Sequence, residues 1–300
     1  MKYIFFINPA AGKGAPAAQL IPEIEKQAAA RGLDCEIYRT SAAGDAARYA
    51  RAVCERGEPV HLYACGGDGT LHEVMNGAAD FENAAVGIVP CGSGNDFVRC
   101  FDAPFDNIGR QLDAPAHPID LIRLSDGRYC ANMANIGLDC DAAAKMQELK
   151  KIPFVRGTLA YVLALAIVFC KRLGCHLCIT CDDQAPFEAN CLLTALGNGR
   201  FCGGGFCGVP LAEFNDGLMD LSIVRKMSRL NVLQIIGKYH DGTHLDSKLG
   251  KKYVQYQRCR KLHIRSDGPF RICVDGEITE HREMTFELIP SAVRLLVPEK

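Results

Sequence analysis

Three glycine-containing loops hold the residues of this sequence that are best suited to bind an anion. They span residues 8–14, 66–70 and 90–97. Glycines let backbone N–H groups approach a phosphate, and the N-terminus of a following helix adds partial positive charge. Asp68 stands among three glycines, where its carboxylate can reach a phosphate-bound Mg²⁺ directly or through water, and Thr70 is suited to cap the next helix. The loops therefore favour a nucleotide site.

Each loop follows a short apolar run and precedes a helical pattern, so the surrounding elements can be predicted. Strands are expected at residues 3–7, 33–39, 60–65 and 85–89, and helices at 16–31, 46–56 and 70–79. Strands that alternate with helices indicate βαβ units and a parallel sheet, whose ligands bind beyond the carboxyl ends of the strands. We expect a Rossmann-like or phosphofructokinase-like α/β domain over residues 1–123, with 286–300 returning to it, and all three loops at one edge of its sheet.

The pattern changes after about residue 120, and residues 124–285 are expected to form a β-rich, antiparallel domain. Strands are predicted at 119–124, 129–136, 175–181, 190–196, 218–224, 261–266, 270–274, 284–289 and 293–297, and helices at 141–151, 156–173 and 228–239. Asp-Gly pairs at residues 126, 267 and 275 are typical of hairpin turns. The apolar stretch 158–170 is shorter than the ~20 residues of a membrane span, which predicts a buried or interfacial helix instead.

Composition narrows the function classes. Lys and Arg number 34 against 35 Asp and Glu, a formal charge of -1, so the chain as a whole has no field to attract nucleic acid or an anionic membrane. The first apolar run is too short for a signal peptide, which predicts a reducing, cytoplasmic setting for the 16 cysteines. We expect buried thiols, and no metal at Cys175, Cys178 and Cys181, because alternate residues of a strand point to opposite faces. His240 and His244 are expected at the surface beside a turn.

The first loop alone leaves alternatives open. It is not a Walker A loop, since Gly14 stands where Ser or Thr would hold magnesium. Gly12, Gly14 and Ala17 fit the GxGxxA pattern of a dinucleotide site, with Asp34 or Glu36 near the position of a ribose-binding acid.

Taken in order along the chain, the motifs resemble those of the diacylglycerol and sphingosine lipid kinases, and most of all the soluble bacterial diacylglycerol kinases. The resemblance covers nearly the whole chain and is specific because it is an ordered series rather than one motif. Its motifs are Asn8-Pro9 with Gly12, residues 66–77, residues 90–99, Asn198-Gly199 with Gly203–Gly205, Pro210 with Ala212, residues 216–220 and residues 274–277. His72 and Ser93 depart from the usual residues at their positions.

The resemblance implies a set of site residues. It implies ATP binding by Asn8, Pro9, Ala10, Ala11, Gly12, Thr40, Gly66, Gly67, Asp68, Gly69, Thr70, Leu71, His72 and Ser93. It implies a structural Mg²⁺ at Glu213, Asp216 and Leu218, with backbone carbonyls at Glu213 and Leu218. Glu277 with Asp275 would deprotonate the lipid hydroxyl. In the sphingosine branch the acid that matches Asp68 is the base, so both assignments stay open.

The sequence therefore predicts an ATP- and Mg²⁺-dependent lipid kinase, with diacylglycerol as acceptor and phosphatidic acid as product. It would be cytoplasmic, peripheral to the inner face of the membrane, without a transmembrane segment or a nucleic-acid partner, and compatible with a homodimer. Two alternatives remain. One is a kinase of a polar substrate that uses the same loop, such as an NAD kinase or a phosphofructokinase-like enzyme. The other is a non-catalytic regulator that binds a lipid or a nucleotide.

Overall fold

A computed structural model describes residues 1–9, 11, 16–92, 94–149, 163–164, 166–169 and 174–300. The chain divides into two compact units. Unit 1 comprises residues 1–121, 214–216 and 289–300, and unit 2 comprises residues 122–213 and 217–288. Most of the predicted helix 156–173 lies outside the described residues, although 163–164 and 166–169 are helical. No helix among the described residues is long and apolar enough to cross a membrane.

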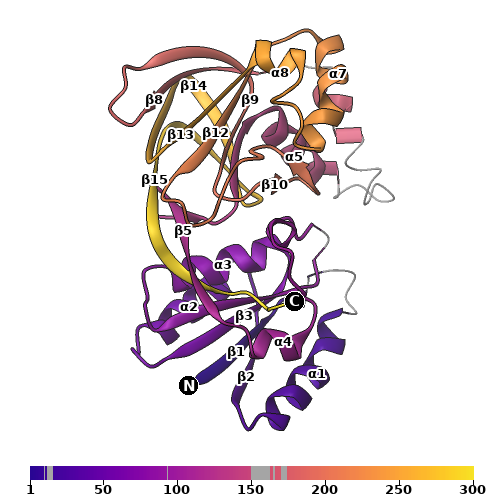
Figure 1. The fold of residues 1–300 in the computed structure, drawn as a ribbon, viewed down its shortest axis with the longest axis vertical. Helices are drawn as coiled ribbons and strands as arrows, with labels where there is room; N and C mark the ends of the chain where they lie inside the picture. The colour runs from indigo at the N-terminus through magenta and orange to yellow at the C-terminus, as the bar shows by residue number, and fades with distance from the viewer. Residues whose placement is uncertain (10, 12–15, 93, 150–162, 165, 170–173) are drawn as a thin grey trace. The chain divides into compact units, whose positions relative to one another are not determined.

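Unit 1 is an α/β fold built on a parallel sheet (Figure 1). Its strands lie in the order β15, β4, β3, β1, β2, and β15 enters only with its last residues, where Leu295 pairs with Val86. The elements are β1 (Lys2–Ile7), α1 (Pro16–Ala30), β2 (Asp34–Arg39), α2 (Asp45–Cys54), β3 (Val60–Gly66), α3 (Asp68–Ala78), β4 (Ala84–Pro90), a short 3₁₀ turn (Val98–Cys100) and α4 (Ile108–Leu112). The predicted α/β domain is confirmed.

Helices cover both faces of this sheet, which is why its inner strands β1, β3 and β4 are buried almost throughout without alternation. Phe5 of β1 belongs to a buried cluster with Ile24 of α1 and Ile108 of α4. On the opposite face the Phe6 ring lies 6.1 Å from that of Tyr49 on α2. α1 packs with α4 and α2 packs with α3, so the strands lie between two pairs of helices. The loops that follow the strands therefore begin from buried, well-packed backbone.

Unit 2 is β-rich and mainly antiparallel, as predicted. β13, β12, β9, β7, β14 and β15 lie in this order, β8 pairs with both β14 and β9, and β10 pairs with β11. The elements are β5 (Ala116–Leu124), which begins in unit 1, β6 (Tyr129–Cys130), β7 (Met133–Gly137), α5 (Leu138–Leu149), β8 (Cys175–Cys181), β9 (Phe187–Gly197), β10 (Phe201–Cys202), β11 (Phe206–Cys207), β12 (Met219–Arg225), α7 (Arg229–His240), α8 (Lys248–Tyr253), β13 (Val254–Cys259), β14 (Lys261–Val274) and β15 (Glu277–Leu296).

The three Asp-Gly pairs have different outcomes. The pair at 126 turns β5 into β6, and the pair at 275 turns β14 into β15. The expected turn at Asp267-Gly268 is wrong, because these residues lie inside β14, where the pairing with β15 shifts between Arg265 and Phe270. A bulge absorbs the extra residues without ending the strand. The strands predicted at 284–289 and 293–297 are likewise parts of the single strand β15.

Candidate active site

The carboxyl ends of β1, β3 and β4 meet at one edge of the unit 1 sheet. Ile7 pairs with Cys65, and Gly66 pairs with Pro90, so the three loops that follow begin side by side. The backbone N–H groups of Cys91 and Gly92 both donate to the Gly66 carbonyl, at 2.9 and 3.1 Å. For the described residues, the expected convergence of the loops is confirmed.

Glycine is required where the second and third loops touch. A Cβ added to Gly92 would lie 2.3 Å from the Cα of Gly67, a backbone atom that cannot move aside without displacing its loop. A Cβ on Gly94 would lie 2.7 Å from Oδ2 of Asp68. Gly69 differs from both, because nothing lies within 4 Å of the position that its Cβ would take. The loops are packed against each other but leave space beside Gly69.

We expect Gly92→Ala to lower the free energy of unfolding by about 1–3 kcal/mol, the usual cost of overpacking. The matched control is Gly69→Ala, which places the same methyl group in open space on a helix and should leave the melting temperature unchanged or slightly raised. Thermal melts of the two variants beside the parent decide the matter. Equal melts for both would contradict the close contact between the loops.

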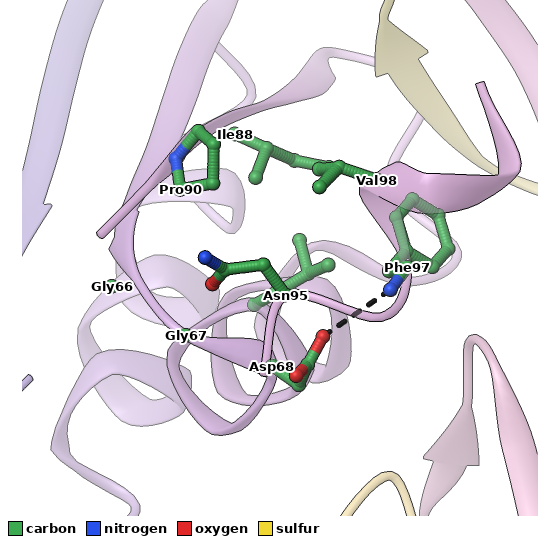
Figure 2. A pocket seen from close by; sticks show the side chains of 9 residues that line it. Gly66, Gly67, Asp68, Ile88, Pro90, Asn95, Phe97 and Val98 are labelled. Carbon is green, nitrogen blue, oxygen red and sulfur yellow. Dashed lines mark hydrogen bonds between the residues drawn. The ribbon is translucent and has the colours of Figure 1, made fainter. Parts of the chain in front are cut away.

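Asp68 lines a small pocket at this edge of the sheet (Figure 2). It is the first residue of α3, and its Oδ1 accepts a hydrogen bond from the Phe97 backbone N–H at 3.3 Å. The pocket is lined by Gly66, Gly67, Asp68, Leu71, Ile88, Pro90, Asn95, Phe97 and Val98. The bond from Phe97 fixes the carboxylate at the pocket wall.

The N-terminus of α3 fits a phosphate. Its N-cap residue is Gly67, which offers no side-chain cap, and the space beside Gly69 is open. An uncapped helix N-terminus presents backbone N–H groups and the positive end of the helix dipole to an anion. The Asp68 carboxylate beside it supplies the oxygen ligand that Mg²⁺ prefers, so the donor set suits a metal-bound nucleotide.

Thr70 does not cap α3, contrary to our expectation. Its buried Oγ1 instead accepts a hydrogen bond from Nδ2 of Asn8 at 3.0 Å. This bond ties the first loop to the second. Thr40 follows β2, and its backbone N–H donates to the Ile7 carbonyl at 3.0 Å, so it too lies at this edge.

The other predicted nucleotide residues differ in exposure. Leu71 lines the pocket, while the His72 side chain is buried in the unit 1 core. Pro9 is exposed and Ala11 is buried. Ala10, Gly12 and Ser93 lie outside the described residues. Glu36, one of the two candidate ribose-binding acids, accepts a hydrogen bond from the Tyr49 hydroxyl at 2.5 Å and pairs with Lys2.

Two residues that the sequence analysis did not assign to the site support it. Glu73 caps α2 by accepting the N–H groups of Gly44 and Ala46 at 2.9 and 3.1 Å. The ring of Phe214, from a distant segment, lies 4.9 Å from that of Phe97. A glutamate on the inward side of a helical pattern is a signal that could have pointed to Glu73. No local pattern indicates the contact of Phe214.

Asp275 is the first residue of the two-residue turn between β14 and β15 in unit 2, and Glu277 is the first residue of β15. Asp275 and Gly276 have φ values of 47° and 97°, which suit an Asp-Gly turn with two left-handed residues. The Asp275 carboxylate accepts backbone N–H groups from Ala131, Asn132 and Met133 at 2.8, 3.0 and 3.0 Å. Its two oxygens thus hold the turn between β6 and β7 in place.

Glu277 has a different environment from Asp275. It is exposed at the first position of β15, paired with Val274 across the hairpin. The two acids therefore differ in environment, because the Asp275 carboxylate accepts backbone amides and the Glu277 carboxylate faces solvent. A solvent-facing carboxylate is available to accept a proton, whereas one that binds three amides serves first to position its neighbours.

The predicted metal ligands fall in both units. Glu213, exposed, and Leu218 belong to unit 2, and Asp216, half-buried, belongs to unit 1. Within the described ranges, no group of three His, Cys, Asp or Glu side chains is placed to hold a metal ion. A site built partly from backbone carbonyls, as the resemblance implies here, needs fewer such side chains.

Asp139, which the sequence analysis did not single out, has a strongly shifted pKa. It lies in the first turn of α5, is half-buried, and its Oδ2 is inaccessible to solvent. Burial raises the pKa of Asp139 to about 6, and the nearby Tyr239 hydroxyl offsets part of that rise. The Tyr239 hydroxyl is likewise inaccessible to solvent.

Asp139→Asn is expected to stabilise the protein in a pH-dependent way. Below about pH 3 the carboxyl is protonated in both folded and unfolded chains. Between about pH 4 and 6 it ionises in the unfolded chain but stays largely protonated in the fold, so the folded state loses stability as the pH rises. The variant should therefore gain about 1–3 kcal/mol at pH 8 and almost nothing at about pH 3. Melts across this range, with the exposed Asp183→Asn as control, measure the gain; a pH-independent difference would contradict it.

The cysteine and histidine expectations have mixed outcomes. Cys175, Cys178 and Cys181 lie on β8 as predicted, with Cys181 buried in the core and Cys178 half-buried on the other face. The cysteines that the structure describes are free thiols. His240 is exposed, but the expectation for His244 is wrong: it is fully buried, and burial lowers its pKa to about 4. Its ring lies 4.8 Å from that of Tyr239 on α7.

Comparisons with known proteins agree with this fold. Residues 2–124 match the diacylglycerol kinase catalytic domain, and residues 132–297 match the YegS C-terminal NAD kinase beta sandwich-like domain. A protein named "Probable lipid kinase YegS-like" from Xanthomonas euvesicatoria is 32% identical over 289 residues, 89% of this chain and 88% of its own length. One of the same name from Alcanivorax borkumensis is 29% identical over 278 residues, 90% of this chain and 89% of its own length.

Solved structures show the same architecture. A diacylglycerol kinase from Bacillus anthracis superposes with a TM-score of 0.71 at 21% identity, over 99% of this chain and 96% of that one. An NAD kinase from Archaeoglobus fulgidus, solved with ATP, gives a TM-score of 0.53 at 11% identity, over 100% of this chain and 95% of that one.

An α/β unit followed by a β-rich unit is the two-domain fold that the chain shares with these structures. Within that fold, the chain belongs to the YegS-like lipid kinase family with a diacylglycerol kinase catalytic domain.

Proposed function

We propose that the protein transfers the γ-phosphate of ATP to the hydroxyl of diacylglycerol and forms phosphatidic acid. The observation that carries this proposal is the convergence of the loops on Asp68 at the uncapped N-terminus of α3. Phosphoryl transfer depends mainly on positioning and on neutralising the charge of the phosphates, and this loop edge offers both. Membership in a lipid kinase family supports a hydroxylated lipid as acceptor.

ATP would lie along the loop edge of unit 1. Asn8, Thr40 and Asp68 lie there in the structure. The complete proposed set is Asn8, Pro9, Ala10, Ala11, Gly12, Thr40, Gly66, Gly67, Asp68, Gly69, Thr70, Leu71, His72 and Ser93. Mg²⁺ would neutralise the phosphates beside Asp68, and a second, structural Mg²⁺ would be held by Glu213, Asp216 and Leu218.

Glu277 is the proposed base and Asp275 its positioning residue. Glu277 would take the proton of the acceptor hydroxyl while the new oxygen–phosphorus bond forms and the bond from the γ-phosphorus to the bridging oxygen of ADP breaks. The exposure of Glu277 supports this division of roles, as do the three amides held by Asp275. Asp68 as base is the alternative, and the variants in the Discussion separate the two.

We further propose that the protein acts in the cytoplasm, peripherally at the inner face of the membrane, and compatibly with a homodimeric state. The acceptor is itself a membrane lipid, which makes the bilayer surface the natural place of the reaction. The absence of a membrane-spanning helix among the described residues is consistent with peripheral contact.

The direct test measures transfer of labelled phosphate from Mg²⁺-ATP to diacylglycerol, a sphingoid base and phosphatidylglycerol in mixed micelles, with NAD and a sugar phosphate as polar acceptors. Labelled phosphatidic acid is the expected product. Labelling of another lipid would keep the lipid kinase and replace the acceptor. Labelling of NAD or the sugar phosphate alone would favour the polar-substrate alternative, and no transfer at all would favour a regulator.

A further inference from the structure

Helix α7 of unit 2 carries leucines on the side that faces away from the core. Ser228 caps the helix by accepting the Asn231 N–H at 3.2 Å. Val232, Ile235 and Tyr239 are its buried residues. With 100° per residue, Leu230 and Leu233 fall on the opposite side, where they are 65% and 60% exposed. One exposed leucine is ordinary on a protein surface. Two adjacent leucines on the solvent side of a helix contribute nothing to the core and call for another explanation.

Basic residues surround these leucines. Residues 225–252 contain seven, Arg225, Lys226, Arg229, Lys238, Lys248, Lys251 and Lys252, against the two acids Asp241 and Asp246. All seven are exposed. α8, which holds the last three lysines, packs beside α7 in unit 2 (Figure 1). Among the described residues, no carboxylate lies within ion-pair distance of the five lysines in this group, which are Lys226, Lys238, Lys248, Lys251 and Lys252. The segment is a local positive patch on a chain of net charge -1.

We propose that this surface docks the protein on an anionic lipid bilayer. We define the α7 face as Leu230 and Leu233 together with Lys226, Lys238, Lys248, Lys251 and Lys252. Leucines on one side of a helix enter the boundary between headgroups and acyl chains, and lysines beside them are attracted to anionic headgroups. The proposal rests on the proposed function, because a kinase whose acceptor is a membrane lipid must reach the bilayer.

Charge separates this occupant from a second copy of the chain. In a twofold-symmetric dimer the same patch meets itself, which would bring the lysines of two copies together without the acids needed to pair them. An anionic bilayer supplies the opposite charge and an apolar layer at once. The arrangement of the α7 face therefore favours a membrane over self-association.

Vesicle sedimentation tests the proposal without any need for turnover. The full chain should bind vesicles of 70% phosphatidylcholine and 30% phosphatidylglycerol, and it should bind pure phosphatidylcholine vesicles much more weakly. Leu230→Gln with Leu233→Gln should weaken binding to the anionic vesicles about tenfold or more, and each of Lys238→Gln and Lys251→Gln about fivefold. Leu211→Gln is the matched control, since Leu211 is 52% exposed but lies outside residues 225–252.

A second measurement keeps this inference separate from the kinase proposal. The double leucine variant should phosphorylate a water-soluble, short-chain diacylglycerol as the parent does, and lose activity only on vesicles. If the parent binds vesicles but phosphorylates no lipid, the kinase proposal fails and the docking surface stands. Equal vesicle binding by parent and double variant would overturn the docking surface, as would a parent dimer that the double variant dissociates.

Discussion

Asp68→Asn is expected to lose nearly all Mg²⁺-ATP-dependent turnover while its melting temperature stays close to that of the parent. Asparagine keeps an oxygen that can accept the Phe97 N–H, and the backbone around residue 68 is set by glycines and by the Gly66 carbonyl. What the substitution removes is the negative charge at the pocket wall. A neutral amide is a far weaker ligand for Mg²⁺, so the charge of the phosphates would no longer be balanced during transfer.

The measurement compares kcat, ATP affinity and thermal melts for Asp68→Asn and for Asp106→Asn. Asp106 is an exposed aspartate of the same unit, so its variant controls for the loss of one negative charge. We expect the control to match the parent in all three quantities. An Asp68→Asn enzyme with parental kcat would remove this carboxylate from the reaction altogether.

Glu277→Gln should lower kcat by ~10²–10⁴, the usual size of general-base catalysis, and should leave ATP affinity and the melting temperature unchanged. The side chain is exposed, so its amide fits where the carboxylate was. Glu280→Gln, three residues along the same strand and equally exposed, is the matched control. Full activity of Glu277→Gln would return the role of base to Asp68.

Asp275→Asn should behave differently from Glu277→Gln. Asn-Gly is as good a turn pair as Asp-Gly, so the turn alone would tolerate the substitution. The amide nitrogen, however, would face N–H groups of residues 131–133 that the carboxylate now accepts. Leaving such donors without an acceptor costs about 1–3 kcal/mol, so this variant should melt earlier as well as react more slowly. A parental melt would contradict the positioning role.

The sequence predicted the elements of unit 1 closely because their signals are local. Apolar runs, helical spacing and glycines at the ends of strands each lie within a few residues, and β3, predicted at 60–65, is found at Val60–Gly66. It was harder to predict that two apolar runs belong to one continuous strand. β15 continues through Ser291, whose φ of 53° departs from extended backbone, where the pattern suggested a break.

The partners of the site residues could be predicted only in part. The meeting of the three loops could be predicted, because each glycine loop follows a parallel strand and parallel strands end at a common edge. The contacts of Asp275 depend on how β7 pairs with β14, with Ala134 opposite Val274, and no local pattern fixes that register. The hydrogen bond of Thr70 could not be predicted for the same reason. Its hydroxyl oxygen accepts from Asn8, 62 residues away, instead of capping its own helix.

The path of β15 has a consequence for synthesis on the ribosome. Unit 1 contains the first 121 residues, yet its sheet is completed by the end of β15, where Leu295 and Leu296 are fully buried and Leu295 pairs with Val86 of β4. Until residues 289–296 leave the exit tunnel, β4 has an unprotected edge that can pair with another nascent chain. The sheet of unit 1 thus waits for residues 289–296, and chaperones that cover strand edges should matter most during this interval.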